Sequence, residues 1–369
     1  MLGVDVKVDA SWALIALLIG YSFFFQFRLV YPSLSTWASV GLAVGETLVF
    51  FGSVLAHELA HAVVAKARGI PVRDITLFLF GGVTRARVES HGPGEEFLIA
   101  VVGPVTSLVL GGALWAVAIL VPGLPDAVAG AVGYLGLVNL ALGVFNLVPG
   151  FPLDGGRLLR STLWKTSGDL GRATRIAAAV GQVVGWLMVA GGLALVATVS
   201  LIGGIWIAAI GWFLVQAARA SYADLRIRTM LEVVDAEEVM TETVVTVPTE
   251  ITIQEAVDRY LRSVDVDAVP VQQDGRTVGI LTVEAVRRLG REHWDDRRVG
   301  EIMAPLVREP RVDAKTRMDR VVRKLEDVEG QRVFVARGAQ VVGVITSGDI
   351  SRWVTGHRGL EREHDRKAA

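Results

Sequence analysis

The stretch "VLAHELAHAV", residues 54–63, places two histidines and a glutamate inside a run of otherwise apolar or small residues. His57 and His61 are four residues apart, so on a helix both imidazoles lie on one face, about one turn apart. That spacing lets both side chains reach one metal ion, while Glu58 beside the first histidine can hold the ion's water without being a ligand. The alternative is a pair of histidines that make ordinary contacts on a helix surface.

The composition places this stretch in a membrane. The chain has 369 residues, of which 52% are hydrophobic, and its net charge is −1. Residues 176–218 contain no charged side chain, and this run is about twice the roughly 20 residues that a helix needs to cross a bilayer. The near-zero net charge gives no reason to expect nucleic acid as a partner. The chain has no cysteine, which excludes disulfides and thiolate metal ligands.

We expect a polytopic α-helical membrane protein with about six transmembrane helices. The apolar segments lie at about 9–27, 40–66, 95–121, 130–148, 176–198 and 201–218, and the last two form a tight hairpin. Ionisable residues inside a membrane segment are costly and usually functional, which favours the metal site over the surface histidines. From Ala223 onward the chain is densely charged, which predicts a soluble C-terminal part.

The distribution of Lys and Arg predicts the orientation of the helices. One set of connecting loops contains nearly all of these residues, and the other set contains only Arg28. Cytoplasmic loops carry the excess of positive charge in membrane proteins. We therefore expect a multi-pass protein of the cell membrane, in contact with the lipid bilayer, with both termini and the soluble part in the cytoplasm.

Residues 70–90, between the second and third helices, are rich in β-branched and aromatic side chains. Gly81 and Gly82 lie in the middle of this segment. Such a composition around a pair of glycines predicts a short β-hairpin.

Two histidines do not complete a catalytic zinc site, which needs three protein ligands and an open position. The remaining histidines lie in a polar loop or in the soluble part, so we expect a carboxylate as the third ligand. The stretch "NLVPGFPLDGGR", residues 146–157, supplies Asp154 where the fourth membrane helix ends. The alternative is that Asp154 caps the N-terminus of the following segment.

These two motifs resemble those of the site-2 protease family of intramembrane zinc metalloproteases, in the prokaryotic branch that carries tandem cystathionine-beta-synthase (CBS) domains. The family pattern is HExxH on one membrane helix and NxxPxxxxDG at a later one, and both match here, at 57–61 and 146–155. Gly81-Gly82 and Gly103-Pro104 also look like family positions. The family often has Asn at the position of Ser107, which leaves open what polar contact this residue makes.

The resemblance implies the roles of the site residues. His57, His61 and Asp154 would be the ligands of one Zn²⁺ per chain, with Glu58 as catalytic base. Asn146 would steady the substrate carbonyl or the oxyanion. The implied activity is that of a zinc metalloendopeptidase that cleaves membrane-spanning protein substrates in regulated proteolysis.

A helix hides its peptide bonds in its own hydrogen-bond ladder, so a membrane-spanning substrate must unwind locally before cleavage. The 70–90 segment could bind the unwound strand by adding it to the edge of a sheet. Gly81 and Gly82 are the residues that we expect to contact this strand.

The soluble part contains an internal repeat, because "GILTVEAV" (279–286) matches "GVITSGDI" (343–350) at a spacing of 64 residues. Two α/β units of about 60 residues each follow, and they resemble a tandem CBS pair. In that family a Thr and an Asp often contact the ribose or phosphate of an adenine nucleotide. Thr346 and Asp349 retain both residues, whereas the first copy has Ala285 in place of the Asp. The alternative is a cytoplasmic dimerisation module that binds no ligand.

The expected organisation is an intramembrane metalloprotease domain at 1–222 and a linker at 223–235. Tandem CBS domains follow at 236–355 (about 236–292 and 297–355), and then a C-terminal tail at 356–369 that we expect to be frayed.

Three functions fit these features. The first is an intramembrane protease regulated by its CBS pair, and the second is a CBS-regulated ion channel or transporter. Glu58 distinguishes them, because a transporter has no need of a base adjacent to a ligand. The third is a catalytically inactive binding protein of the same fold, which the complete motifs disfavour.

Overall fold

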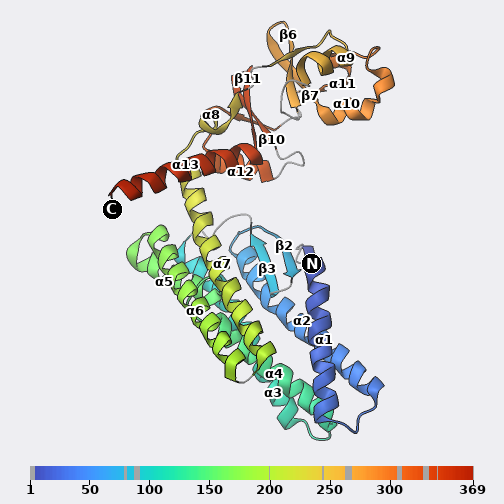
Figure 1. The fold of residues 1–369 in the computed structure, drawn as a ribbon, viewed down its shortest axis with the longest axis vertical. Helices are drawn as coiled ribbons and strands as arrows, with labels where there is room; N and C mark the ends of the chain where they lie inside the picture. The colour runs from blue at the N-terminus through green and yellow to red at the C-terminus, as the bar shows by residue number, and fades with distance from the viewer. Residues whose placement is uncertain are drawn as a thin grey trace. The chain divides into compact units, whose positions relative to one another are not determined.

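The computed structural model describes residues 5–78, 81–86, 92–198, 200–242, 245–261, 268–305, 310–326, 332–338 and 340–368. The chain forms two compact units, Met1–Leu225 and Arg226–Ala369. The first consists of long helices with a small sheet, and the second is an α/β unit (Figure 1).

Within the described part of the chain, six helices are long and apolar enough to cross a membrane, as the sequence predicts, and the last of them continues past the end of the first unit. They are α1 (Ala10–Val30), α2 (Thr36–Ala67), α3 (Pro93–Leu120), α4 (Asp126–Asn146), α6 (Leu170–Thr198) and α7 (Leu201–Glu232). The helix α7 continues well beyond residue 218, because residues 219–232 contain neither Gly nor Pro to end it. Most of the segment expected to be a linker is therefore helical.

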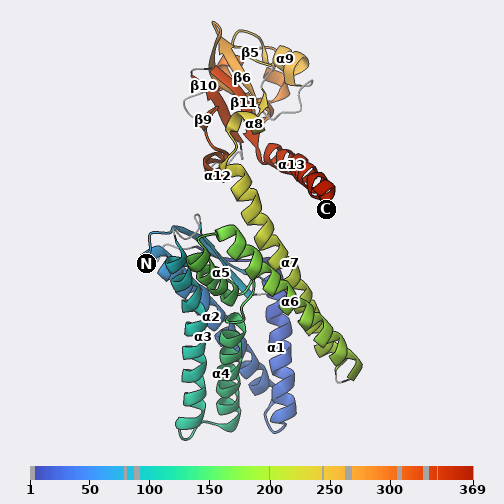
Figure 2. The same cartoon turned by 90° about the vertical axis from the view of Figure 1, so that its left-hand side faces the viewer.

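Close packing of backbones joins the membrane helices in pairs. A Cβ atom added at Gly111 of α3 would lie 2.8 Å from the carbonyl oxygen of Gly136 on the neighbouring α4 (Figure 2). In the hairpin of α6 and α7, a Cβ atom at Gly192 would lie 2.5 Å from the nitrogen of Ala208. Small residues at such contacts let helices approach closely where no hydrophobic effect drives their association. The expected tight turn between the last two helices is confirmed.

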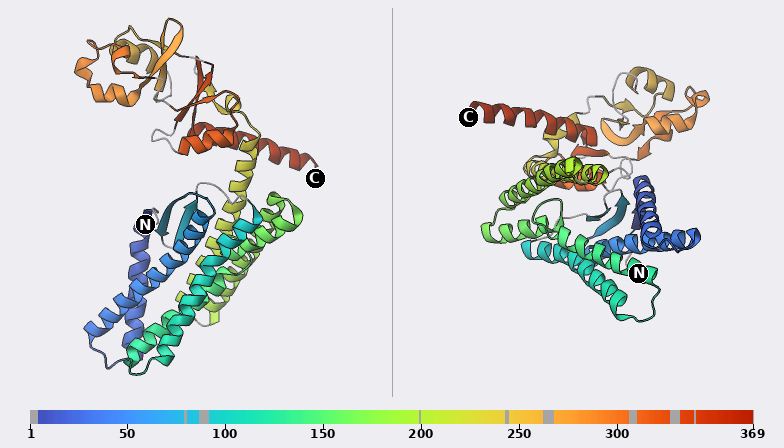
Figure 3. Two further views of the ribbon diagram at one scale, coloured as in Figure 1. Left: turned by 180° about the vertical axis from the view of Figure 1, so that it is seen from behind. Right: turned by 60° about the horizontal axis from the view of Figure 1, so that its bottom comes forward.

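The first unit contains a three-stranded sheet, and the strands β2 and β3 of this sheet lie beside α2 (Figure 3). The expected hairpin is confirmed as β2 (Val72–Phe78) paired antiparallel with β3 (Gly81–Ala86). An unpredicted strand, β1 (Asp5–Val8), pairs with β2 in parallel, and Lys7 Nζ lies 3.0 Å from Asp74 Oδ2. A four-residue strand gives too short a pattern to be recognised in the sequence. The resulting order is β1-β2-β3, so β3 is an edge of this sheet.

A tight loop leads from α4 to α5 (Asp154–Ser167) and fixes where α5 begins. The loop lies against α6, where Phe151 N donates to the carbonyl oxygen of Ala177 at 3.1 Å. A Cβ atom at Gly181 would lie 2.0 Å from the carbonyl oxygen of Phe151, so only glycine permits this approach. The loop therefore holds the first residue of α5 in place.

The second unit contains two four-stranded sheets of matching design. One has the order β5-β6-β7-β8 and the other the order β4-β11-β10-β9. The strands of the first sheet are β5 (Val247–Pro248), β6 (Ala268–Gln273), β7 (Arg276–Thr282) and β8 (Ala304–Pro305). Those of the second are β4 (Thr241–Glu242), β9 (Arg311–Asp313), β10 (Arg332–Arg337) and β11 (Gln340–Thr346). The helices are α8 (Ala236–Val239), α9 (Ile253–Ala256), α10 (Val283–Leu289), α11 (Val299–Ile302), α12 (Met318–Glu326) and α13 (Ser347–Ala368).

The two copies of the repeat exchange a strand. β4 comes early in the first copy and pairs with β11 of the second, while β8 comes early in the second copy and pairs with β7 of the first. A buried cluster shared by the two sheets includes Ile280 of β7 and Phe334 of β10. The helix α13 runs to Ala368, so the tail expected to be frayed continues this helix.

Candidate metal centre

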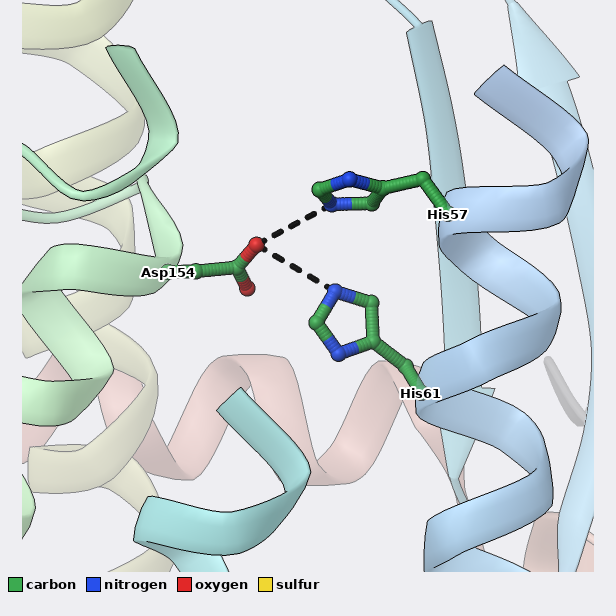
Figure 4. Close-up of side chains that lie close together, drawn as sticks. All are labelled: His57, His61 and Asp154. Atoms are coloured by element: carbon green, nitrogen blue, oxygen red, sulfur yellow. Dashed lines mark hydrogen bonds and ion pairs between the residues drawn. The ribbon is translucent and has the colours of Figure 1, made fainter. Parts of the chain in front are cut away.

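The helix α2 carries both histidines of the HELAH motif. Its buried face includes His57 and His61, each 5% exposed, and their ring centroids lie 4.9 Å apart. Both side chains point toward the N-terminus of α5 (Figure 4). The i, i+4 spacing thus places the two imidazoles side by side inside the helical bundle.

Asp154 meets these histidines from α5. Its Oδ2 lies 3.1 Å from His57 Nε2 and 3.2 Å from His61 Nε2 (Figure 4). The residue at the N-cap position is Leu153, which makes no side-chain capping bond, so Asp154 does not serve as the N-cap. The structure thus brings the two histidines together with a carboxylate that lies 97 and 93 positions further along the chain.

The hydrogen bonds of the rings indicate that a cation belongs among these three groups. The Nδ1 of His61 lies 2.6 Å from the carbonyl oxygen of Ile99, which can only accept, so this nitrogen carries the hydrogen. In a neutral imidazole the Nε2 lone pair then faces the Asp154 carboxylate, which is also an acceptor. Two acceptors at 3.2 Å repel one another unless a proton or a metal ion lies between them.

The separations of the donor atoms fit a zinc ion. Zn–N and Zn–O bonds of about 2.0–2.2 Å in a tetrahedral site place neighbouring ligand atoms roughly 3.3–3.6 Å apart. The distances of 3.1 and 3.2 Å from Asp154 Oδ2 to the Nε2 atoms of His57 and His61 are close to this separation. All three potential ligand atoms lie within 4.8 Å of one another. Two imidazole nitrogens and one carboxylate oxygen also match the chemistry of catalytic zinc sites, which keep one position open.

The helix α3 completes the surroundings of the two histidines. A Cβ atom at Gly103 would lie 2.2 Å from His61 Nε2 and 2.6 Å from His57 Nε2, so any side chain there would occupy the space of the ion. One turn further on, the fully buried Ser107 places its Oγ 2.9 Å from His57 Nδ1. The sequence interpretation left this contact open, although Gly103 and Ser107 share a helix face at i, i+4 spacing.

The other predicted residues of the first unit lie on α2, α4 and β3. Glu58 follows His57 on α2 and is half-buried. Asn146 is the last residue of α4, also half-buried, and its Nδ2 donates to the carbonyl oxygen of Leu142 at 3.0 Å. Gly81 and Gly82 begin the edge strand β3.

In the second unit, Asp349 lies at the start of α13 and is 5% exposed. Its Oδ2 accepts from the nitrogen and hydroxyl of Thr346 at 2.8 and 2.6 Å. Its Oδ1 accepts from the hydroxyl of Thr241 at 2.6 Å and from Arg352. Burial alone would raise the pKa of the Asp349 carboxyl, but these hydrogen bonds hold it below its ordinary value. Thr346 and Asp349 therefore lie together, and the hydrogen-bonding capacity of the Asp349 carboxylate is already largely used.

The family model of peptidase family M50 matches residues 46–130 and 125–191, and that of the CBS domain matches residues 236–292. The chain is 36% identical to "Putative zinc metalloprotease Rip3" of Mycobacterium tuberculosis over 90% of its length and 85% of that protein. The chain belongs to peptidase family M50, the family of site-2 proteases.

Two further comparisons concern Methanocaldococcus jannaschii. A zinc metalloprotease of this organism is 31% identical over 83% of each chain. A solved structure of its site-2 protease resembles 60% of this chain and 92% of its own, with 28% identity and a TM-score of 0.42.

The family assignment makes this M50 protein a multi-pass intramembrane zinc metalloprotease with a C-terminal CBS module. It confirms the resemblance drawn from the two motifs. It also favours the protease over the channel or transporter.

The close approach of α3 predicts the effect of one methyl group. Gly103→Ala should greatly lower the zinc content, because the Cβ would lie among the donor nitrogens. Gly94→Ala on the same helix is the matched control, since a Cβ there meets no atom within 4 Å. Metal analysis of both purified variants, beside their thermal unfolding, checks this. Normal zinc in Gly103→Ala would show that the ion does not lie where the three donors converge.

Proposed function

We propose that His57, His61 and Asp154 hold the catalytic zinc of this protease and that Glu58 is its general base. One observation carries this proposal, namely the convergence of three potential ligand atoms from α2 and α5 at separations that suit one zinc ion. The burial of both histidines and the glycine at position 103 support it further.

Each residue has a chemical task in this proposal. Zinc in such a site lowers the pKa of water to about 7 and polarises the scissile carbonyl. The Glu58 carboxylate accepts the proton of the attacking water and later delivers it to the nitrogen of the leaving amine. Asn146 has two amide N–H groups, of which one donates to Leu142, and the other is the donor that stabilises the oxyanion of the substrate carbonyl.

Glu58→Gln tests the division of roles. The change removes the base and leaves the three ligands in place, so we expect cleavage of a membrane-spanning substrate to fall by at least ~10²-fold, while bound zinc stays near wild type. Cleavage assays and metal analysis on one preparation measure both. Normal cleavage would contradict the assignment of Glu58. Wild-type protein that holds zinc but cleaves no membrane-spanning substrate would favour the transporter or the inactive binding protein.

We further propose that the unwound substrate binds as an additional strand beside β3, with Gly81 and Gly82 at the contact. The position of β3 at a sheet edge supports this, because an edge strand offers unpaired backbone groups. The strand also packs against α2, which carries the HELAH motif.

Gly82→Val tests this strand addition. A bulky β-branched side chain should impede the approach of a second backbone, so we expect slower cleavage at unchanged zinc content. Thr84→Val is the control, because that position of β3 already carries a β-branched residue. Equal cleavage by the wild type and Gly82→Val would rule out binding at this edge.

For the soluble part we propose that the CBS pair binds an adenine nucleotide at Thr346 and Asp349 and thereby regulates the protease. The carboxylate of Asp349 receives four hydrogen bonds, about as many as its lone pairs allow, so a ribose hydroxyl must displace one partner. Arg352 suits that exchange, because its side chain is 75% exposed. The proposed protease domain is 1–222, and the proposed CBS domains span 236–355 (about 236–292 and 297–355). We also propose that both termini lie in the cytoplasm and that the protein forms a homodimer through its CBS pairs.

Asp349→Asn tests the nucleotide site. The amide oxygen of Asn can still accept a hydrogen bond from Thr346 at the start of α13, but the amide nitrogen donates where the second carboxylate oxygen accepted. A ribose hydroxyl therefore loses its acceptor, and we expect ATP affinity to fall about tenfold, or ~1.4 kcal/mol. Thr282→Ala in the first copy, where Ala285 stands in place of Asp, should leave ATP affinity unchanged. Calorimetric titration of the full-length protein with ATP measures both. Absence of ATP binding by the wild type would favour the dimerisation module without a ligand.

A further inference from the structure

A buried ion pair joins α3 to α5 beside the proposed metal centre. Arg160 of α5 donates from Nε to Glu96 Oε1 at 2.7 Å, and its Nη2 donates to the same oxygen. The Arg160 side chain is 14% exposed and that of Glu96 is 1% exposed. Both charges are thus largely removed from water, although both belong to residue types that are almost never fully buried.

The Glu96 side of this pair belongs to the helix that surrounds the histidines. Glu96 lies in the first turn of α3, one turn before Ile99, whose carbonyl oxygen accepts from His61 Nδ1. Gly103 and Ser107, which lie against the two imidazoles, follow on the same helix. A displacement of this end of α3 would therefore shift the partners of both histidines.

The Arg160 side of the pair belongs to the segment that carries the third donor. Arg160 lies on α5, which begins with Asp154, and its guanidinium lies over the ring of Phe151, 5.2 Å from the centroid. Phe151 precedes Asp154 by three residues and Arg160 follows it by six. The guanidinium therefore contacts the chain on both sides of the carboxylate donor.

Stability does not explain why the pair is buried. Removing two charges from water costs several kcal/mol per ion, and well-packed apolar residues of similar volume often stabilise as well or better. No group of the described residues donates a hydrogen bond to the Oε2 of Glu96, so within this part of the chain the pair leaves one of its own acceptors unsatisfied. A guanidinium held by one carboxylate and one ring does, however, fix the direction of the side chains around it.

We propose that Glu96 and Arg160 are positioning residues that set the distance of Asp154 from the two histidines and thereby set the zinc affinity. This inference rests on the proposed ligand set. Partners outside the direct ligands typically change metal affinity by about 10- to 100-fold when they are removed. The pair would fix the position of α5, which carries Asp154, relative to α3, which contacts both histidines.

Two variants separate positioning from stability. Glu96→Leu combined with Arg160→Met removes both charges at similar volume, so we expect an unchanged or higher Tm and zinc affinity weaker by ~10- to 100-fold. Arg160→Lys retains the charge but loses the planar fork over Phe151, and we expect it to weaken zinc binding in the same direction. Arg175→Lys is the control, since Arg175 makes a similar contact with the ring of Tyr222, 5.8 Å from the centroid.

The measurements are zinc affinity by chelator competition and the visible spectrum of the Co²⁺-substituted protein, which reports the ligand geometry. Wild-type affinity and an unchanged spectrum in both variants would overturn the proposal. If the double variant does not fold, the zinc affinity and the Co²⁺ spectrum of Arg160→Lys alone decide whether the proposal holds. Wild-type protein that binds no zinc would instead refute the proposed ligand set, and this inference with it.

Discussion

The first unit depends on one electrostatic constraint, namely that His61 Nε2 and the Asp154 carboxylate repel one another unless a proton or a metal ion lies between them. The carbonyl of Ile99 fixes the hydrogen of His61 on Nδ1, so its Nε2 lone pair faces the carboxylate of Asp154. The fold therefore holds together three potential ligand atoms in an arrangement that a bound cation stabilises.

The helix α3 supplies most of the partners that surround the proposed metal centre, although none of the proposed ligands lies on it. At Gly103 it has no side chain, so its backbone lies directly against the imidazoles. The hydroxyl of Ser107 contacts His57, and the carbonyl oxygen of Ile99 contacts His61. Its first turn also reaches α5 through Glu96. Partners of this kind orient metal ligands and tune their basicity, which is why they matter nearly as much as the ligands themselves.

The strong local signals of the sequence predicted much of this structure. Long apolar runs located the six helices, the HELAH spacing located the two imidazoles, and the glycines at 81 and 82 located the hairpin. The strand β1 and the exchange of β4 and β8 between the CBS copies depend on pairings between distant segments. Neither the short strand nor the strand exchange produces a periodic pattern of apolar residues in the local sequence. The contacts of Ser107 and of the Glu96–Arg160 pair likewise depend on how three helices pack, and a serine or an ion pair has no distinctive neighbours in sequence.

The central claim is that residues 57, 61 and 154 bind one ion, and metal content tests it most directly. The measurement compares zinc per chain in the purified wild type, His57→Ala and Asp154→Ala, each shown to be folded by its thermal unfolding. The account predicts about one zinc in the wild type and a sharp loss in both variants, although the two positions lie 97 residues apart. Full zinc occupancy in Asp154→Ala, or no zinc in wild-type protein purified with ample metal, would contradict it.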